Sequence, residues 1–181
     1  MGVFSLFYFL ENRMNANVND FIASIYNQFL NFINSGSDDA VIDNAKRILS
    51  LRLKKKGINA LEDFNSVKEY LILWFANEDA VKFCCIYLDQ EHRFIQCQNV
   101  FFGSIKQCEK HIKEISRTAL MSNASSVIFS NNVRSLTDYD TSCIKNIKIA
   151  QDALTLIDVR VIDHLFICGS EHFSLKEEGL L

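Results

Sequence analysis

The stretch ASSVIFSNNVRSLTDYDTSC, residues 124–143, decides how this chain is interpreted. Its apolar run, Ser125–Phe129, is typical of a strand that is covered on both faces. The polar segment that follows holds Asn131, Asn132 and Ser135 but no histidine, and it leads into a helix-like stretch. Loops of this kind often carry chemistry in α/β proteins, because backbone amides converge there beside a helix start. Whether this loop is catalytic is therefore the first question.

Outward from this stretch, helical and strand-like periodicities alternate along the chain. Apolar residues at helical spacing predict helices over residues 20–33, 39–56, 65–77, 108–122 and 139–157. Short β-branched or aromatic runs predict strands over residues 81–89, 92–103, 125–129 and 159–168, followed by a tail, residues 171–181. The order of helices and then β-β-α-β-α-β predicts the α/β class, with a sheet flanked by helices and an N-terminal helical extension.

The composition limits the class of protein further. The chain has 181 residues, 49% of them hydrophobic and 23% charged, which is typical of a globular protein with one ordinary domain. Its net charge of -3 gives no global indication of nucleic acid as a partner. Six cysteines without a C-x-x-C pair predict free thiols in a reducing cytoplasm. The apolar start, residues 1–10, is shorter than the about 20 residues that span a bilayer. We expect it to pack on the domain, with docking to another chain as the alternative.

A series of short motifs then resembles a known family. The motifs are Leu88-Asp89 with His92-Arg93, Gly103-Ser104, His111-Ile112-Lys113-Glu114, Asn123-Ala124, Asp163-His164 and Ser174-Leu175-Lys176-Glu177. In this order they resemble the RadC family, whose core is a JAB/MPN domain of the zinc-metalloprotease type with a layered, cytidine-deaminase-like sheet. The resemblance covers residues 39–181. It implies an apolar segment and helix over residues 1–38, a helical lead-in over 39–77, and a degenerate RadC-like JAB/MPN domain over 78–181.

The resemblance also implies which residues would hold zinc, and here the sequence departs from the family. Active members use two histidines spaced H-x-H, a downstream aspartate, and a glutamate from an earlier strand as general base. The matching positions are Asn131 and Val133 for the histidines, Cys143 for the aspartate with Asp140 as a substitute, and Val81 for the glutamate. Amides are poor zinc ligands and valine has no donor atom. The resemblance therefore implies a former metal site, with no metal, no cofactor and no hydrolase activity.

Two other interpretations of these polar residues stay open. Asn131, Asn132 and Ser135 most simply satisfy backbone groups of a turn. The alternative is a remnant binding pocket formed by Asn132, Ser135 and Asp140. A rearranged metal site would have to draw on Cys143, His164, Cys168 or His172, which lack a recognised ligand spacing apart from the weak C-x3-H of the last two.

A run of cations marks the second predicted helix. Its members are Lys46, Arg47, Arg52, Lys54, Lys55 and Lys56. Cations in the last turns of a helix complement its dipole, which is the simplest interpretation. A patch for nucleic acid or an acidic partner is the alternative.

Together these patterns predict a catalytically inactive RadC-like module that binds another protein, with a homo-oligomer as one form of that binding and no membrane. The first alternative is a DNA-repair-associated nucleic-acid-binding protein. The RadC family is conventionally linked to DNA repair. This link is weak support for DNA binding by this chain, because the segment before the domain lacks a glycine-rich helix-hairpin-helix signal. The second alternative is a metallohydrolase with a rearranged site.

Overall fold

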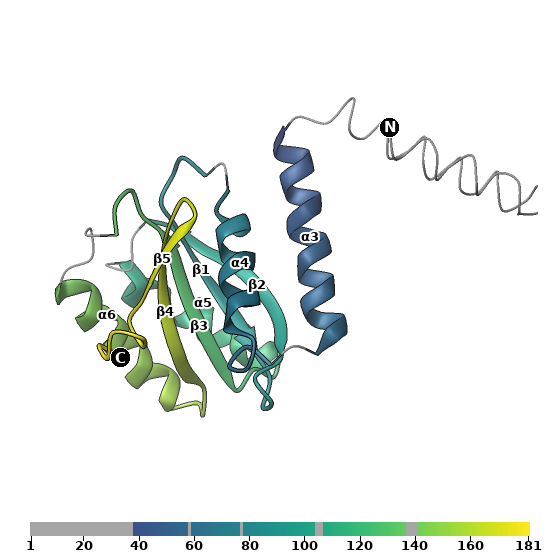
Figure 1. The fold of residues 1–181 in the computed structure, drawn as a ribbon. Coiled ribbons are helices and arrows are strands. Elements are labelled where there is room, and N and C mark those ends of the chain that lie inside the picture. The colour runs from purple at the N-terminus through teal and green to yellow at the C-terminus, as the bar shows by residue number, and fades with distance from the viewer. Residues whose placement is uncertain (1–37, 58, 77, 104–106, 137–140) are drawn as a thin grey trace, which may run out of the picture. The chain divides into compact units, whose positions relative to one another are not determined.

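The computed structural model describes residues 38–57, 59–76, 78–103, 107–136 and 141–181 (Figure 1). The chain divides into two compact units, residues 1–43 and 44–181. The predicted helix over residues 20–33 and the apolar start lie outside the described residues. The predicted domain boundaries after residues 38 and 77 stay predictions. All the strands and helices described below lie in the second unit, apart from the first turns of the helix that begins at Asp38.

Five strands form one mixed sheet in the order β2-β1-β3-β4-β5. Their bounds are β1 Lys82–Leu88, β2 Phe94–Phe102, β3 Ser126–Asn132, β4 Arg160–Cys168 and β5 Glu171–Ser174. The sequence KFCCIYL of β1 is apolar on both faces, and six of its seven residues are buried because it lies inside the sheet. The strand β2 alternates between buried and exposed positions more strongly, as an edge strand does.

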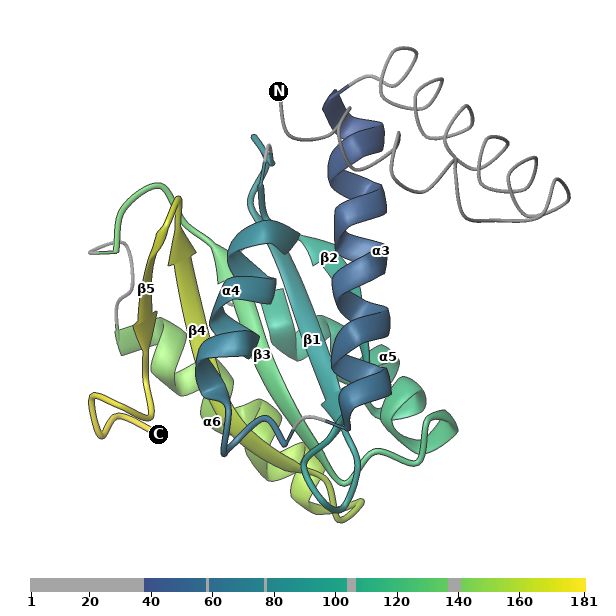
Figure 2. The same ribbon diagram turned by 45° about the vertical axis from the view of Figure 1, so that its right-hand side comes forward.

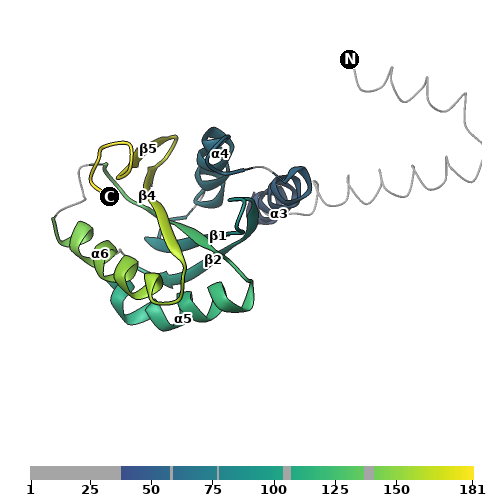
Figure 3. The ribbon, with the colours of Figure 1, turned by 90° about the horizontal axis from the view of Figure 1, so that it is seen from below.

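Helices cover both faces of the sheet, as the view along its edge in Figure 3 shows. Their bounds are α3 Asp38–Lys56, α4 Phe64–Trp74, α5 Cys108–Met121 and α6 Thr141–Thr155. One core cluster lies between the sheet and α5 and α6, around Phe83, Phe129 and Phe166. A second cluster on the other face joins α3 and α4 to the sheet through Leu53, Leu71 and neighbouring strand residues.

The connections place the ends of β3 and β4 side by side. The two strands are parallel and are joined through α6, whereas β1 and β2 form an antiparallel hairpin and β4 and β5 another (Figure 2). The register of β3 against β4 shifts between Val127 and Ile128, so that Ile128 faces Asp163 and Phe129 faces His164. Such a bulge re-aims the side chains that follow it. As a result His164 lies on the α5 and α6 face beside Phe129.

The predicted α/β class is confirmed, and three details differ from the sequence-based prediction. The strand β3 runs on to Asn132, so Asn131 and Asn132 are strand residues rather than loop residues. The tail begins with the strand β5, because its residues can pair with the end of β4. The helix α4 begins at Phe64 and ends at Trp74 instead of spanning residues 65–77, and its N-cap is Asp63, whose carboxylate accepts a hydrogen bond from the Ser66 backbone. Within the described ranges, no helix has the length and apolarity to cross a membrane.

Candidate functional site

The carboxyl end of β3 places Asn131 against His164 of β4. Asn131 is 1% exposed, His164 is fully buried, and His164 Nε2 donates a hydrogen bond of 2.8 Å to Asn131 Oδ1. The amide nitrogen of Asn131 donates to the Asn132 carbonyl at 3.2 Å, which leaves its oxygen for the histidine. Because an amide oxygen can only accept, the ring proton lies on Nε2. The predicted position of a metal ligand is thus occupied by an amide that is already hydrogen-bonded.

Aromatic rings enclose His164 and keep it neutral. Its ring centroid lies 4.4 Å from Phe166, 6.0 Å from Phe83 and 6.4 Å from Phe129. Burial among these rings lowers the pKa of His164 to about 3, since an imidazolium would be desolvated there. Among the described residues, its second nitrogen, Nδ1, has no hydrogen-bond partner. The pair is therefore a buried neutral hydrogen bond inside an apolar core.

Two other positions that match the family's metal ligands, Val133 and Cys143, lie at this core, and the position of the general base, Val81, lies just before β1. Val133 follows β3 and packs against the cluster between the sheet and α5 and α6. Cys143 lies near the start of α6 and is 3% exposed within the same cluster. Val81 immediately precedes β1, which pairs with β3 so that Phe83 faces Asn131, and its carbonyl accepts a hydrogen bond from Gly103 at 2.7 Å. That these three and Asn131 are vestigial metal-site positions stays a prediction.

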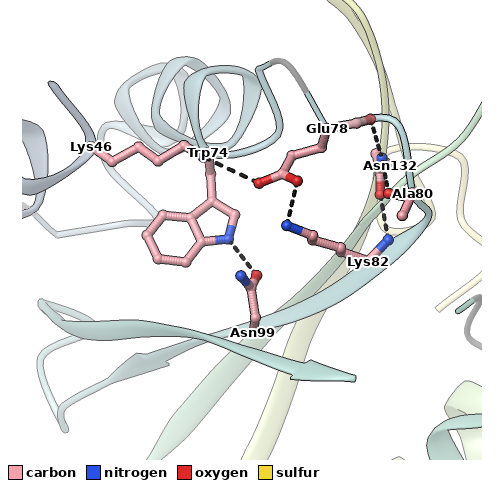
Figure 4. A network of polar contacts seen from close by, with 7 residues as sticks. All are labelled: Lys46, Trp74, Glu78, Ala80, Lys82, Asn99 and Asn132. Carbon is pink, nitrogen blue, oxygen red and sulfur yellow. Dashed lines mark hydrogen bonds and ion pairs between the residues drawn. The ribbon is translucent and has the colours of Figure 1, made fainter. Parts of the chain in front are cut away.

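Asn132 points to the other side and fastens the chain segment before β1. Its Oδ1 accepts from the Lys82 backbone at 2.6 Å, and its Nδ2 donates to the carbonyls of Glu78 at 3.3 Å and Ala80 at 2.9 Å (Figure 4). The turn predicted around Asn132 is therefore wrong, because its partners lie about fifty positions away in the chain. The same network holds the Glu78 carboxylate between Lys82 and Lys46, the latter at 3.4 Å.

The charge balance of this network is favourable. Burial by itself would raise the pKa of Glu78, but the hydrogen bonds and charges of Lys82 and Lys46 outweigh it and hold the pKa below its usual value.

A cavity of about 440 Å³ lies beside Asn132, Val133 and Glu78. Ser135 does not line this cavity, and Asp140 lies outside the described residues. Of the three residues predicted to form a remnant pocket, Asn132 thus lines this cavity, and the remnant pocket itself stays a prediction.

Among the described residues, the donor set does not fit zinc. A hydrolytic zinc site needs three protein ligands, chiefly imidazoles and carboxylates, and an open position for water. At this place the amide oxygen of Asn131 is taken by His164, Val133 has no donor, and Cys143 is a single thiol buried in the core. Across the described ranges, no three His, Cys, Asp or Glu side chains form a group that could hold a metal ion.

The residues of the alternative metal site do not come together in a ligand set. Cys168 donates through its thiol to the Arg134 carbonyl at 3.4 Å, and His172 Nε2 lies 4.0 Å from the Glu177 carboxylate. His164 is committed to Asn131.

The six predicted cations differ in their surroundings, and a shared basic patch stays a prediction. Lys46 is half-buried and paired with Glu78, whereas Arg52 and Lys55 are exposed. Arg47 and Lys54 line a separate hollow beside β2. The side chain of Lys56 lies outside the described part of the structure.

In the described part of the chain, the five-stranded mixed sheet flanked by four helices defines an α/β protein of the JAB-like class. The sequence model of the RadC-like JAB domain matches residues 61–180. The chain therefore belongs to the RadC-like JAB domain family.

Relatives from several bacteria support this membership. A UPF0758 protein of Coxiella burnetii is 33% identical over 147 residues, which cover 78% of this chain and 63% of the relative. UPF0758 proteins of Herminiimonas arsenicoxydans and Nitrosomonas europaea are 35% and 34% identical over 143 residues, with the same shares of each chain. The chain thus spans about 63% of the length of these relatives.

Proposed function

We propose that this chain is a RadC-like JAB domain that has lost zinc chemistry and acts by binding another protein. The hydrogen bond of 2.8 Å between His164 Nε2 and Asn131 Oδ1 carries the proposal. It uses the one oxygen that Asn131 could offer to a cation, at the position that matches the family's first histidine. Three aromatic rings lie around His164 and keep this histidine in an apolar environment.

Activation of water by zinc depends on the number and the charge of the protein ligands. Zinc activates water by lowering its pKa from about 15.7 to about 7, and this requires a cation held by three protein ligands. With an engaged amide, a valine and one thiol, the site would supply at most one anionic ligand. The domain then has no zinc-bound hydroxide that could attack a carbonyl. Val81, at the position of the family's glutamate, cannot take a proton from water as a general base does.

Without that chemistry, the remaining role of the domain is recognition. The partner is another protein, and self-association into a homo-oligomer is one form of it. The six cysteines are thiols, which fits a reducing cytoplasm. The chain spans about 63% of the length of its relatives. An activity or a partner of those longer proteins is therefore assigned to this chain only as part of the proposal.

A turnover assay tests the loss of chemistry. The full chain is supplied with zinc and incubated with fluorogenic peptide and isopeptide substrates, with and without a chelator. We expect no turnover that the chelator abolishes, because no ligand set holds the activating ion.

The variant Cys143→Ser is the matched control, since it removes the one thiol of the site at nearly constant volume. It should behave as the unaltered chain does. Hydrolysis that a chelator abolishes, that zinc restores and that Cys143→Ser weakens would contradict the proposal and favour a metallohydrolase with a rearranged site.

A further inference from the structure

The strand β2 is an edge of the sheet. Among the described residues, β2 pairs with β1 on one side and has no neighbouring strand on the other. Its nine residues, Phe94–Phe102, make it as long as β4. An edge of this length presents unpaired backbone N–H and C=O groups that another extended chain can pair with.

A hollow runs along this open edge. It has a volume of about 280 Å³ and is lined by four consecutive residues of β2, 94–97, together with residues of α3 and Trp74 of α4. Phe94 and Cys97 belong to the core on the α3 and α4 face, whereas Ile95 packs on the opposite face. A hollow that contacts consecutive residues from both faces lies at the strand's edge rather than over one face of the sheet.

The chain itself already uses the start of this edge for antiparallel pairing. Asn59 forms an isolated antiparallel bridge with Arg93, the residue directly before β2. The Ala60 backbone donates to the His92 carbonyl at 2.8 Å. Beyond this single bridge no described segment continues the pairing along residues 94–102. The edge is therefore geometrically suited to an added strand, and the bridge marks where that strand would meet the chain.

The wall that α3 contributes is cationic and apolar. Arg47 and Lys54 are exposed, and Leu51 between them is 54% exposed. Residues seven apart lie on the same side of a helix, about 10 Å apart along its axis. Arg47 contacts Asn44 at 3.1 Å, and no described carboxylate pairs with either cation. This contrasts with Lys46 and Arg93 nearby, whose charges are paired with Glu78 and with Asp89 and Glu91.

The opposite wall is rigid. The Trp74 indole donates to Asn99 Oδ1 of β2 at 2.8 Å, and Lys46 lies over the ring at 5.8 Å from its centroid (Figure 4). Tyr70 packs against both Trp74 and Phe94, with ring centroids 5.6 and 5.4 Å apart. A preorganised wall reduces the entropy that a bound segment must overcome.

We infer that the β2 edge binds an extended acidic segment of a partner protein, which adds a strand antiparallel to β2 and directs its carboxylates at Arg47 and Lys54. The inference rests on the proposed role as a protein-binding module and names its surface. A peptide fits better than a nucleic acid, because only a peptide can pair with the edge's backbone groups and because the hollow offers two cations rather than a continuous basic track.

The test uses the full chain and a fluorescein-labelled peptide of about ten residues, which matches the length of β2 and alternates glutamate with valine. Fluorescence anisotropy should show saturable binding. The double variant Arg47→Glu/Lys54→Glu should weaken it by about tenfold or more, because two attractive pairs become repulsive. The matched double variant Arg52→Glu/Lys55→Glu, with the same change of net charge, should alter the affinity by about twofold or less.

Two further peptides separate strand addition from general attraction of charge. A peptide with proline at two adjacent central positions should lose binding, because one of any two successive N–H groups of a strand points at the edge and proline lacks this group. A peptide with lysine in place of glutamate should not bind.

The inference is overturned by any of four results: no saturable binding, equal loss in both double variants, unchanged binding of the proline peptide, or tighter binding of a single-stranded DNA that the first double variant abolishes. These results leave the proposed loss of zinc chemistry untouched, since that proposal is tested by turnover and metal content.

Discussion

Replacing Asp163 by alanine should lower the free energy of unfolding by about 3 kcal/mol. The Asp163 carboxylate is buried and accepts three hydrogen bonds: from the His164 backbone at 2.7 Å, from the Lys176 backbone at 3.0 Å and from Ser174 Oγ at 2.6 Å. The substitution would leave the buried His164 N–H, the half-buried Lys176 N–H and the Ser174 hydroxyl without their acceptor. It would also release β5 and Leu175, which is fully buried behind it. Urea unfolding followed by the fluorescence of Trp74, the single tryptophan, measures the loss.

Two variants sharpen this experiment. Burial raises the pKa of Asp163, so its ionised form is costly, and the hydrogen bonds offset part of this. Asp163→Asn keeps an acceptor for both backbone groups and should stay within about 1 kcal/mol of the unaltered chain. Asp152→Ala removes an exposed carboxylate that pairs with Lys148 at 3.5 Å and should have little effect. Equal stabilities of the Asp163→Ala and Asp152→Ala variants would contradict the role of Asp163 as an anchor.

Acid should destabilise the fold through His164. Its pKa is lowered to about 3 in the folded chain, whereas an unfolded histidine titrates near about 6.5. The unfolded state therefore binds more protons between these two values, and stability is lost as the pH falls below about 6.5. Between pH 7 and pH 5 this group alone should remove about 2 kcal/mol of unfolding free energy.

The variant His164→Gln isolates this contribution from that of other groups. Its amide nitrogen can take the place of Nε2 and donate to Asn131, but it does not titrate. Carboxylates such as Asp89 and Glu78, whose pKa values are lowered in the fold, also lose stability in acid and do so in both proteins. The difference in unfolding free energy between the two proteins should change by about 2 kcal/mol from pH 7 to pH 5, and a constant difference would show that His164 is not buried as a neutral ring.

Much of the fold follows from the sequence because its signals are local. The apolar run of β1 and the helical spacing of apolar residues in α5 can each be recognised within the segment itself. The strand β5 was missed because EHFS has no strong strand pattern of its own, and its pairing depends on the end of β4. The end of β3 was placed too early for a similar reason, since asparagines are depleted in strands and these two are held there by long-range partners.

The candidate site could be predicted only in part. The positions of Asn131, Val133 and Cys143 follow from spacing within matched motifs, and the structure brings these three to one core cluster or its edge. The engagement of Asn131 by His164 could not be predicted, because it depends on the bulge in β4 that turns His164 toward β3. The hollow at β2 could not be predicted because its walls come from three elements distant in sequence. The predicted run of cations includes Arg47 and Lys54, but the sequence alone does not distinguish these two from the other four.

The zinc content of the purified chain tests the central claim most directly. The chain is expressed with zinc in the medium, purified without chelators, dialysed and measured by inductively coupled plasma mass spectrometry alongside protein concentration. The account predicts about 0.1 zinc per chain or less, because an engaged amide, a valine and one buried thiol cannot replace three anionic or imidazole ligands. About one zinc per chain, lost in an Asn131→Ala/Cys143→Ala variant that still folds, would contradict it.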